Sequence, residues 1–227
     1  REELLFDKDK LLANGDRSLV ALCHAMSVLA TSGISPIGGV QTSDMGVAGE
    51  AVMMIFMLFA LSRLTFSKDT VTATQGGLMT DPEFRIGIVI VLGVPLILFA
   101  RHFLGAYDVE SVRNIGQAAY AFWGAVFTVM SFLTTTGFVS EHWSEAQSWS
   151  GLATPGLILM GLALIGGGVA TTAGGVKLLR VFALYRNGVR ELERLVHPNS
   201  VSGAGTAGRR LQSNGAFIAW IFFMLFA

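Results

Sequence analysis

The sequence predicts an all-α membrane protein, and three observations lead to this fold class: the composition, the spacing of the charged residues and an internal repeat. Of the 227 residues, 52% are hydrophobic and 14% are charged, whereas about a quarter of the residues of an average soluble domain are charged. The 16 basic and 16 acidic residues balance, which excludes the basic composition typical of nucleic-acid-binding proteins. Cys23 is the single cysteine, so a disulfide framework is also excluded.

Long segments of the chain carry no charged side chain. Residues 114–140 and 151–176 contain no Asp, Glu, Lys or Arg, and residues 18–43 contain only the potential charge of His24. A helix that crosses a bilayer needs about 20 mostly apolar residues, so these segments favour membrane helices over the buried helices of a large soluble protein. Because the chain starts without Met and stops inside the apolar run 216–227, we expect it to be a fragment of a longer protein.

The sequence contains a repeat with an offset of 104 residues. Residues 26–34 read Met-Ser-Val-Leu-Ala-Thr-Ser-Gly-Ile, and residues 130–138 read Met-Ser-Phe-Leu-Thr-Thr-Thr-Gly-Phe. Transporters commonly contain such duplicated membrane units. We expect each unit to consist of a half-length helix, an extended Thr/Ser-Gly segment and a full inner helix, the last at 47–62 and at 151–168. For the second unit, the preceding outer helix is expected at about 86–104.

The two Thr/Ser-Gly segments are candidate ion-binding sites. β-Branched Thr favours an extended backbone, and Gly permits the backbone angles that turn successive carbonyl groups toward one axis. A ring of carbonyl oxygens can replace the hydration shell of a cation. For one copy alone, a membrane helix interrupted by Gly is the simpler interpretation, but two copies at a fixed offset favour a filter. The expected ion-binding residues are Thr31, Ser32, Gly33, Thr135, Thr136 and Gly137.

A glycine-rich stretch at residues 166–177 is unique to the second unit. It reads Gly-Gly-Gly-Val-Ala-Thr-Thr-Ala-Gly-Gly-Val-Lys, and each Gly in a helix interior costs about 1 kcal/mol relative to Ala. We therefore expect the inner helix to break here into a loop within the membrane. Such a loop is a candidate gate, and close packing of helices through small residues is the alternative. The expected gate residues are Ala170, Thr171, Thr172, Ala173, Gly174 and Gly175.

The distribution of charge predicts the orientation in the membrane. The polar segments expected on one side hold 6 basic and 11 acidic residues, and those expected on the other side, residues 63–85 and 177–210, hold 10 basic and 5 acidic residues. Lys and Arg mark the cytoplasmic side, so the Thr/Ser-Gly segments should open outward. The pattern of residues 177–197 predicts a basic amphipathic helix, which would contact lipid headgroups or a cytoplasmic partner. Glu50 and Arg63, at the ends of the first inner helix, are expected to reach toward the headgroups.

These residues resemble the TrkH/KtrB/HKT superfamily of potassium transporters, and bacterial TrkH proteins most closely. The resemblance rests on His24–Ser27 ahead of the first Thr/Ser-Gly segment, on Thr134–Phe138, on Ala173–Lys177 and on residues 188–198. It implies repeated units of outer helix, pore helix, filter and inner helix around one ion pathway, four in the whole protein. Two positions depart from the usual pattern: Ala170 begins the Ala-Thr-Thr of the loop where Gly-Ser-Thr is common, and Ile34 stands where Phe is common.

The resemblance also implies a division of the chain and a set of partners. The implied divisions are the end of the second pore repeat at 1–66, a cytoplasmic loop at 67–85, the third repeat with its intramembrane loop at 86–176, a cytoplasmic basic helix and linker at 177–214, and the start of a fourth repeat at 215–227. Potassium is implied as the transported ion, bound only by the filter residues, with no cofactor in this chain. A homodimer in the bacterial inner membrane, spanning it several times, and a cytosolic nucleotide-binding (NAD or ATP) regulatory subunit of the TrkA type are implied as well.

Two other function classes remain as alternatives. A secondary transporter of another small solute could use broken helices at the membrane midplane, but it would place basic groups near the helix breaks, and the apolar runs hold Thr, Ser and Gly instead. An enzyme within the membrane would need paired His, Asp or Glu side chains, and the runs contain none. The sequence therefore favours a cation pathway without bond chemistry. It leaves open whether transport is channel-like or coupled to another ion as symport.

Overall fold

The computed structural model of the chain describes residues 17–43, 45–62, 81–105, 115–150, 154–169 and 171–196, together with Trp220, Ile221, Met224 and Leu225. All regular elements among these residues are helical, which confirms the all-α fold that the sequence predicts. Several predicted segments lie outside the described residues: most of the loop expected at 67–85, the linker at the end of the segment expected at 177–214 and, apart from those four residues, the start of a fourth repeat at 215–227.

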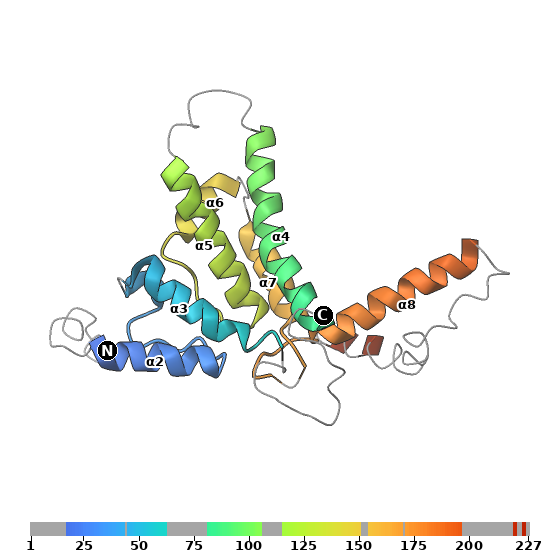
Figure 1. The fold of residues 1–227 in the computed structure, drawn as a ribbon, viewed down its shortest axis with the longest axis horizontal. Coiled ribbons are helices and arrows are strands. Elements are labelled where there is room, and N and C mark those ends of the chain that lie inside the picture. Colours follow the sequence, from blue (N-terminus) through green and yellow to red (C-terminus); the bar gives the residue numbers. More distant parts are fainter. Residues whose placement is uncertain are drawn as a thin grey trace.

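Helix α5 lies at the centre of the helical assembly. Figure 1 shows α4, α5 and α7 side by side, α2 next to α3 at one end, and α8 leading away from the others. Helix α5 packs against α3, α4, α6 and α7. The elements, in chain order, are α2 (Arg17–Leu29), the 3-10 helix η1 (Val40–Thr42), α3 (Gly46–Leu58), α4 (Pro82–Gly105), α5 (Ile115–Leu133), α6 (Trp143–Ser150), α7 (Pro155–Ile165) and α8 (Leu178–Val196).

The apolar core follows one stripe of α5. Phe127, Met130 and Leu133, three residues apart, are fully buried and pack in the same cluster as Met57 and Leu61 from the end of α3. Residues with this spacing share one face of a helix. The core therefore holds the C-terminal end of α5 against the neighbouring unit, directly before the second Thr/Ser-Gly segment begins.

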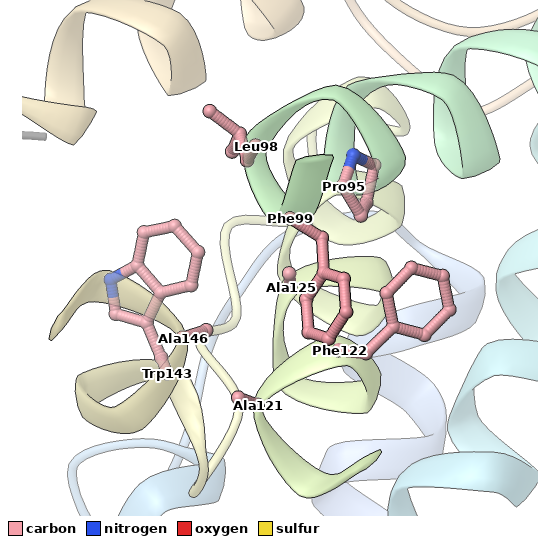
Figure 2. Close-up of a pocket in the computed structure, with 8 residues that line it drawn as sticks. All are labelled: Pro95, Leu98, Phe99, Ala121, Phe122, Ala125, Trp143 and Ala146. Carbon is pink, nitrogen blue, oxygen red and sulfur yellow. The ribbon is translucent and has the colours of Figure 1, made fainter. Parts of the chain in front are cut away.

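Helix α6 covers the contact between α4 and α5. Figure 2 shows Trp143 and Ala146 of α6 beside Phe99 of α4 and Phe122 of α5. The two phenylalanine rings meet edge to face, with centroids 5.8 Å apart. The crevice between these helices has a volume of about 10 Å³, far below the ~300 Å³ of a small-molecule site. We conclude that this contact is packing and not a binding site.

Among the residues that the structure describes, two helical segments are long and apolar enough to cross a membrane, Pro82–Ala100 of α4 and Gly116–Leu133 of α5. Side chains of α4 such as Val89 and Ile97 are about two-thirds exposed, as expected for a helix that faces lipid. The sequence predicted the position of α4. The half-length helix predicted before the second Thr/Ser-Gly segment is instead the 19-residue α5.

The two inner helices are shorter than predicted. Helix α3 ends at Leu58, and the chain continues to Leu61 through turns in which each amide bonds the carbonyl three residues earlier. Helix α7 ends at Ile165 because Gly166 adopts a φ of +73°. This end agrees with the helix break that the glycines predict. Helix α6 was not predicted, since its eight residues are mostly polar and lack a clear apolar period.

Candidate functional site

The two Thr/Ser-Gly segments have the same backbone conformation. Thr31 and Thr135 have φ values of +48° and +57°, and Gly33 and Gly137 have φ values of +66° and +84°. Non-glycine residues with positive φ are uncommon, so their occurrence at matching positions 104 residues apart shows that the duplicated sequence folds alike. Three backbone hydrogen bonds also recur at this offset. In the first unit they join Ala30 N to Met26 O, Thr31 N to Val28 O and Ser32 N to Ser27 O. In the second unit they join Thr134 N to Met130 O, Thr135 N to Phe132 O and Thr136 N to Ser131 O.

The two segments lie against each other. A Cβ atom added to Gly33 would stand 2.3 Å from the carbonyl oxygen of Thr136, so only glycine allows this approach. A Cβ atom on Gly137 would meet no described atom within 4 Å, and there it is the positive φ that favours glycine. The structure thus brings together the predicted residues of both segments, with the backbone of one facing a carbonyl of the other.

Hydroxyl groups brace the second segment from within. The Thr134 hydroxyl lies 2.9 Å from the Met130 carbonyl oxygen and 3.0 Å from the Thr136 hydroxyl, and both threonines are buried. In the first segment Ser32 takes the position of Thr136. Its hydroxyl lies 3.1 Å from the hydroxyl of Ser27, but its side chain is exposed. These bonds connect each segment to the helix that precedes it, which is α2 for the first segment and α5 for the second.

The predicted break after α7 forms a closed loop, the glycine loop (residues 166–177). It returns to its starting point through backbone bonds from Val176 N to Leu164 O and from Lys177 N to Ile165 O, both 2.9 Å long. Added Cβ atoms on Gly166 or Gly175 would collide with backbone atoms on the opposite side of this closure. The glycines are therefore needed for close approach of the two ends of the loop.

The glycine loop also packs on the end of α3. Gly168 N donates a hydrogen bond of 3.0 Å to the carbonyl oxygen of Ala60, and a Cβ atom on Gly168 would stand 2.3 Å from the carbonyl oxygen of Leu61. On another side, the carboxylate of the buried Glu83, in the first turn of α4, accepts a bond of 3.3 Å from Val169 N. The loop is thus placed between the two units. Ala170, one of the predicted gate residues, lies outside the described residues.

Three hydrogen bonds join the glycine loop to the Thr/Ser-Gly segments and to the end of α2. The Thr31 hydroxyl lies 2.9 Å from the Thr172 carbonyl oxygen and 2.8 Å from that of Ala30, so it shares its one hydrogen between them. The Thr172 hydroxyl donates to the carbonyl oxygen of Leu29 at 3.0 Å. Gly174 N donates to the Thr135 hydroxyl at 2.7 Å. Thr31 and Thr135, which take equivalent positions in the two segments, therefore contact the loop directly.

A cavity of about 200 Å³ borders the glycine loop. Its lining consists of apolar side chains from α2 and the end of α3 on one side and two loop threonines on the other: Val28, Leu29, Phe56, Phe59, Ala60, Thr171 and Thr172. The cavity therefore lies between the first unit and the glycine loop.

The remaining polar residues serve as structural hydrogen-bonding groups. His24 is buried and lies 2.8 Å from the Ser35 hydroxyl through Nε2, so it links α2 to the stretch that follows the first Thr/Ser-Gly segment. Within the part of the chain that the structure describes, His, Cys, Asp and Glu side chains form no group of three that could hold a metal ion.

Sequence reasoning misplaced Glu50. We expected its carboxylate to reach toward lipid headgroups, but the side chain is 1% exposed. It accepts hydrogen bonds from Trp123 of α5 and from Ser140 and Glu141, which follow the second Thr/Ser-Gly segment. An acidic residue in an apolar helix does suggest a buried polar partner, but the partners lie about 70 to 90 residues away and no local pattern identifies them.

Comparison with known proteins places these features in a family. The family model TrkH, described as a cation transport protein, matches residues 8–227. A Trk system potassium uptake protein TrkH from Vibrio parahaemolyticus is 31% identical over 221 residues, covering 91% of this chain and 41% of that protein. The Escherichia coli K12 protein of the same name is 36% identical over 149 residues, covering 65% of this chain and 28% of that protein.

The fold agrees with this relationship. The crystal structure of the potassium transporter TrkH from Vibrio parahaemolyticus superimposes with a TM-score of 0.72 and 25% sequence identity, covering 96% of this chain and 44% of that one. Where the match covers most of this chain, the chain spans about two fifths of the length of its relative. With a family model matched over nearly all of its residues and a fold in common, the chain belongs to the TrkH family of cation transport proteins.

Proposed function

We propose that this chain forms part of a pathway for potassium uptake, with the two Thr/Ser-Gly segments as two strands of its selectivity filter. Thr31, Ser32 and Gly33 are the ion-binding residues of one strand, and Thr135, Thr136 and Gly137 are those of the other. The observation that carries the proposal is the shared backbone of the two segments, with positive φ at the same threonine and glycine positions. Such angles turn successive carbonyl groups toward one side, as coordination of a dehydrated cation requires. The names of the relatives support potassium as the ion.

The glycine loop is the gate in this proposal, with Ala170–Gly175 as its moving part. Its bonds to Thr31 and Thr135 hold it against the cytoplasmic side of the filter, and the neighbouring cavity gives it a second position. Each net hydrogen bond is worth about 0.5–1.5 kcal/mol. A segment held by a few such bonds can switch between two positions at a moderate free-energy difference.

The setting of the pathway follows from the family and the charge pattern. As a member of the TrkH family the protein is a membrane protein, and we propose that it passes the bacterial inner membrane several times with the Thr/Ser-Gly segments facing outward. Helix α8 carries four arginines on a segment that leaves the helical assembly, which supports a cytoplasmic position. We further propose a homodimer and a cytosolic nucleotide-binding regulatory subunit that contacts this side.

Complementation tests the proposal. The full-length protein is expressed in bacteria that lack their own potassium uptake systems, and growth is followed as external potassium is lowered. We expect growth at low potassium and uptake of radioactive rubidium that potassium suppresses more strongly than sodium. Growth no better than that of cells with an empty vector, despite protein in the membrane, would refute the proposed function.

A further inference from the structure

We propose that Glu50 is a positioning residue for the filter: its carboxylate, on α3 of the first unit, fixes the stretch that follows Gly137 in the second unit and thereby contributes to ion selectivity. This inference rests on the proposed function of the Thr/Ser-Gly segments. It assigns to one buried side chain the connection between the two units at the outer end of the pathway.

The carboxylate of Glu50 receives three hydrogen bonds from the second unit. Trp123 Nε1 on α5 and the hydroxyl of Ser140 donate to Oε2 at 2.8 Å and 2.9 Å, and the backbone amide of Glu141 donates to Oε1 at 2.8 Å. An indole N–H and a backbone N–H can only donate. Glu50 is therefore held as an acceptor on both oxygens, a role that a neutral amide of the same shape cannot fill.

The Ser140 hydroxyl has its hydrogen directed to Glu50. Its oxygen accepts a bond of 3.1 Å from His142 N, a group that can only donate. On its other side, Ser140 N donates to the hydroxyl of Thr128 on α5 at 3.2 Å. Ser140 is thus held from the pore helix of its own unit and from the inner helix of the other, three residues beyond Gly137.

Burial makes this arrangement sensitive to small changes. Glu50 is 1% exposed, and Ser140 and Thr128 are 0% exposed. A buried donor that loses its acceptor has no water to replace it. The Glu141 donor is a backbone amide, so it can reach another acceptor only if the backbone moves, and this backbone is continuous with Gly137. The geometry of the second filter strand therefore depends on a carboxylate that does not itself touch the ion.

The substitution Glu50→Gln tests the proposal. The amide keeps the size of the side chain but places an NH₂ group against at least one of the three donors. In the full-length protein, reconstituted in liposomes, we expect the ratio of potassium to sodium flux to fall about tenfold, which corresponds to ~1.4 kcal/mol of lost discrimination. This ratio does not depend on the amount of folded protein, so a purely structural role would leave it unchanged.

Glu145→Gln is the matched control. Glu145 on α6 is five residues beyond Ser140 and 47% exposed at its side chain, and its carboxylate lies 3.7 Å from His142 Nδ1. Its substitution removes an acidic side chain from the same end of the molecule and leaves the three Glu50 bonds in place. We expect this variant to keep the wild-type flux ratio. An equal change in both variants would mean that surface charge and not positioning sets selectivity, and would overturn the proposal.

Trp123→Phe provides a second measurement and covers the case in which Glu50→Gln folds poorly. It removes one donor and leaves the carboxylate in place, and we expect a smaller fall in the flux ratio. Because both side chains act through the same bonds, Trp123→Phe should add little to Glu50→Gln in the double variant. Wild-type ratios in both single variants, or full additivity in the double variant, would overturn the proposal. If the wild-type protein transports no potassium, the proposed function itself fails.

Discussion

Thr31 and Thr172, which lie 141 residues apart in the sequence, bind each other's chain segment. The Thr31 hydroxyl donates to the Thr172 carbonyl oxygen at 2.9 Å, and the Thr172 hydroxyl donates to the carbonyl oxygen of Leu29 at 3.0 Å. A third bond of 2.7 Å joins Gly174 N to the Thr135 hydroxyl. Any movement of the glycine loop away from the Thr/Ser-Gly segments breaks these bonds. Each is worth about 0.5–1.5 kcal/mol, and the Thr31 bond less, because its hydrogen is shared with the Ala30 carbonyl oxygen. Together they favour the position of the loop that the structure shows.

The first prediction concerns the hydrogen bonds between the glycine loop and the Thr/Ser-Gly segments. Thr172→Val keeps the branched shape and removes the hydroxyl, so the closed position should lose one hydrogen bond of about 0.5–1.5 kcal/mol. We expect basal potassium flux per folded molecule to rise about two- to tenfold. Flux is measured in liposomes without a regulatory subunit. Thr171→Val is the control, because its hydroxyl bonds the Gly168 carbonyl oxygen within the loop itself; a similar rise in both variants would argue against a role of these hydrogen bonds.

The second prediction concerns the filter glycines. Gly33→Ser and Gly137→Ser both force a side chain into a positive φ, which costs about 1–2 kcal/mol, and at Gly33 the new Cβ would also collide with the Thr136 carbonyl oxygen. We expect both variants to lose preference for potassium over sodium, Gly33→Ser more severely. The measurement is uptake of rubidium and sodium by cells under potassium limitation.

A glycine outside the filter separates this effect from general damage. Gly93, in the middle of α4, has ordinary helical angles and would meet no described atom within 4 Å with a Cβ atom added. Gly93→Ser should keep the wild-type ion preference. Unchanged preference in both filter variants would show that the Thr/Ser-Gly segments do not select the ion.

The third prediction concerns the length of the glycine loop. Removal of Thr171–Ala173 deletes the contact to Thr31 but spares the bonds that close the loop at Leu164 and Ile165. We expect membrane insertion and folding to persist, basal flux to increase and dependence on a regulatory subunit to weaken. If the glycines serve only helix packing, flux per folded molecule will stay at the wild-type value while thermal stability falls.

The fourth prediction concerns orientation. Arg186 is exposed and Arg190 half-exposed on α8, with the Arg186 guanidinium 5.9 Å from the centre of the Phe182 ring. Cysteines at these two positions, in a Cys23→Ser background, should react with an impermeant reagent only from the cytoplasmic side of oriented vesicles. Reaction from the outside would invert the orientation drawn from the Lys and Arg distribution.

The fold class and the repeat could be predicted because their causes are local. The charge-free runs reflect the ~20 residues that a bilayer requires, and the aligned segments at 26–34 and 130–138 proved to share their backbone angles and hydrogen bonds. The end of α7 followed from the glycines, because their helix cost depends on residue type alone. The roles of the filter and gate residues stay predictions.

The contacts between distant segments could not be predicted. Glu50 at the start of an apolar helix suits a side chain that reaches for headgroups, and only the fold brings Trp123 and Ser140 within hydrogen-bonding distance. The same holds for the bond between Thr31 and Thr172. The length of α5 was underestimated because only the residues directly before the second Thr/Ser-Gly segment were assigned to a helix, whereas α5 begins at Ile115 and takes in the polar Gln117.

Competition for rubidium uptake tests the central claim most directly. The purified full-length protein is reconstituted in liposomes loaded with potassium, and uptake of radioactive rubidium is measured while external potassium or sodium is raised. The account predicts uptake above that of protein-free liposomes, suppressed by potassium at concentrations where sodium has little effect. Uptake no greater than in protein-free liposomes, or equal suppression by the two ions, would contradict it.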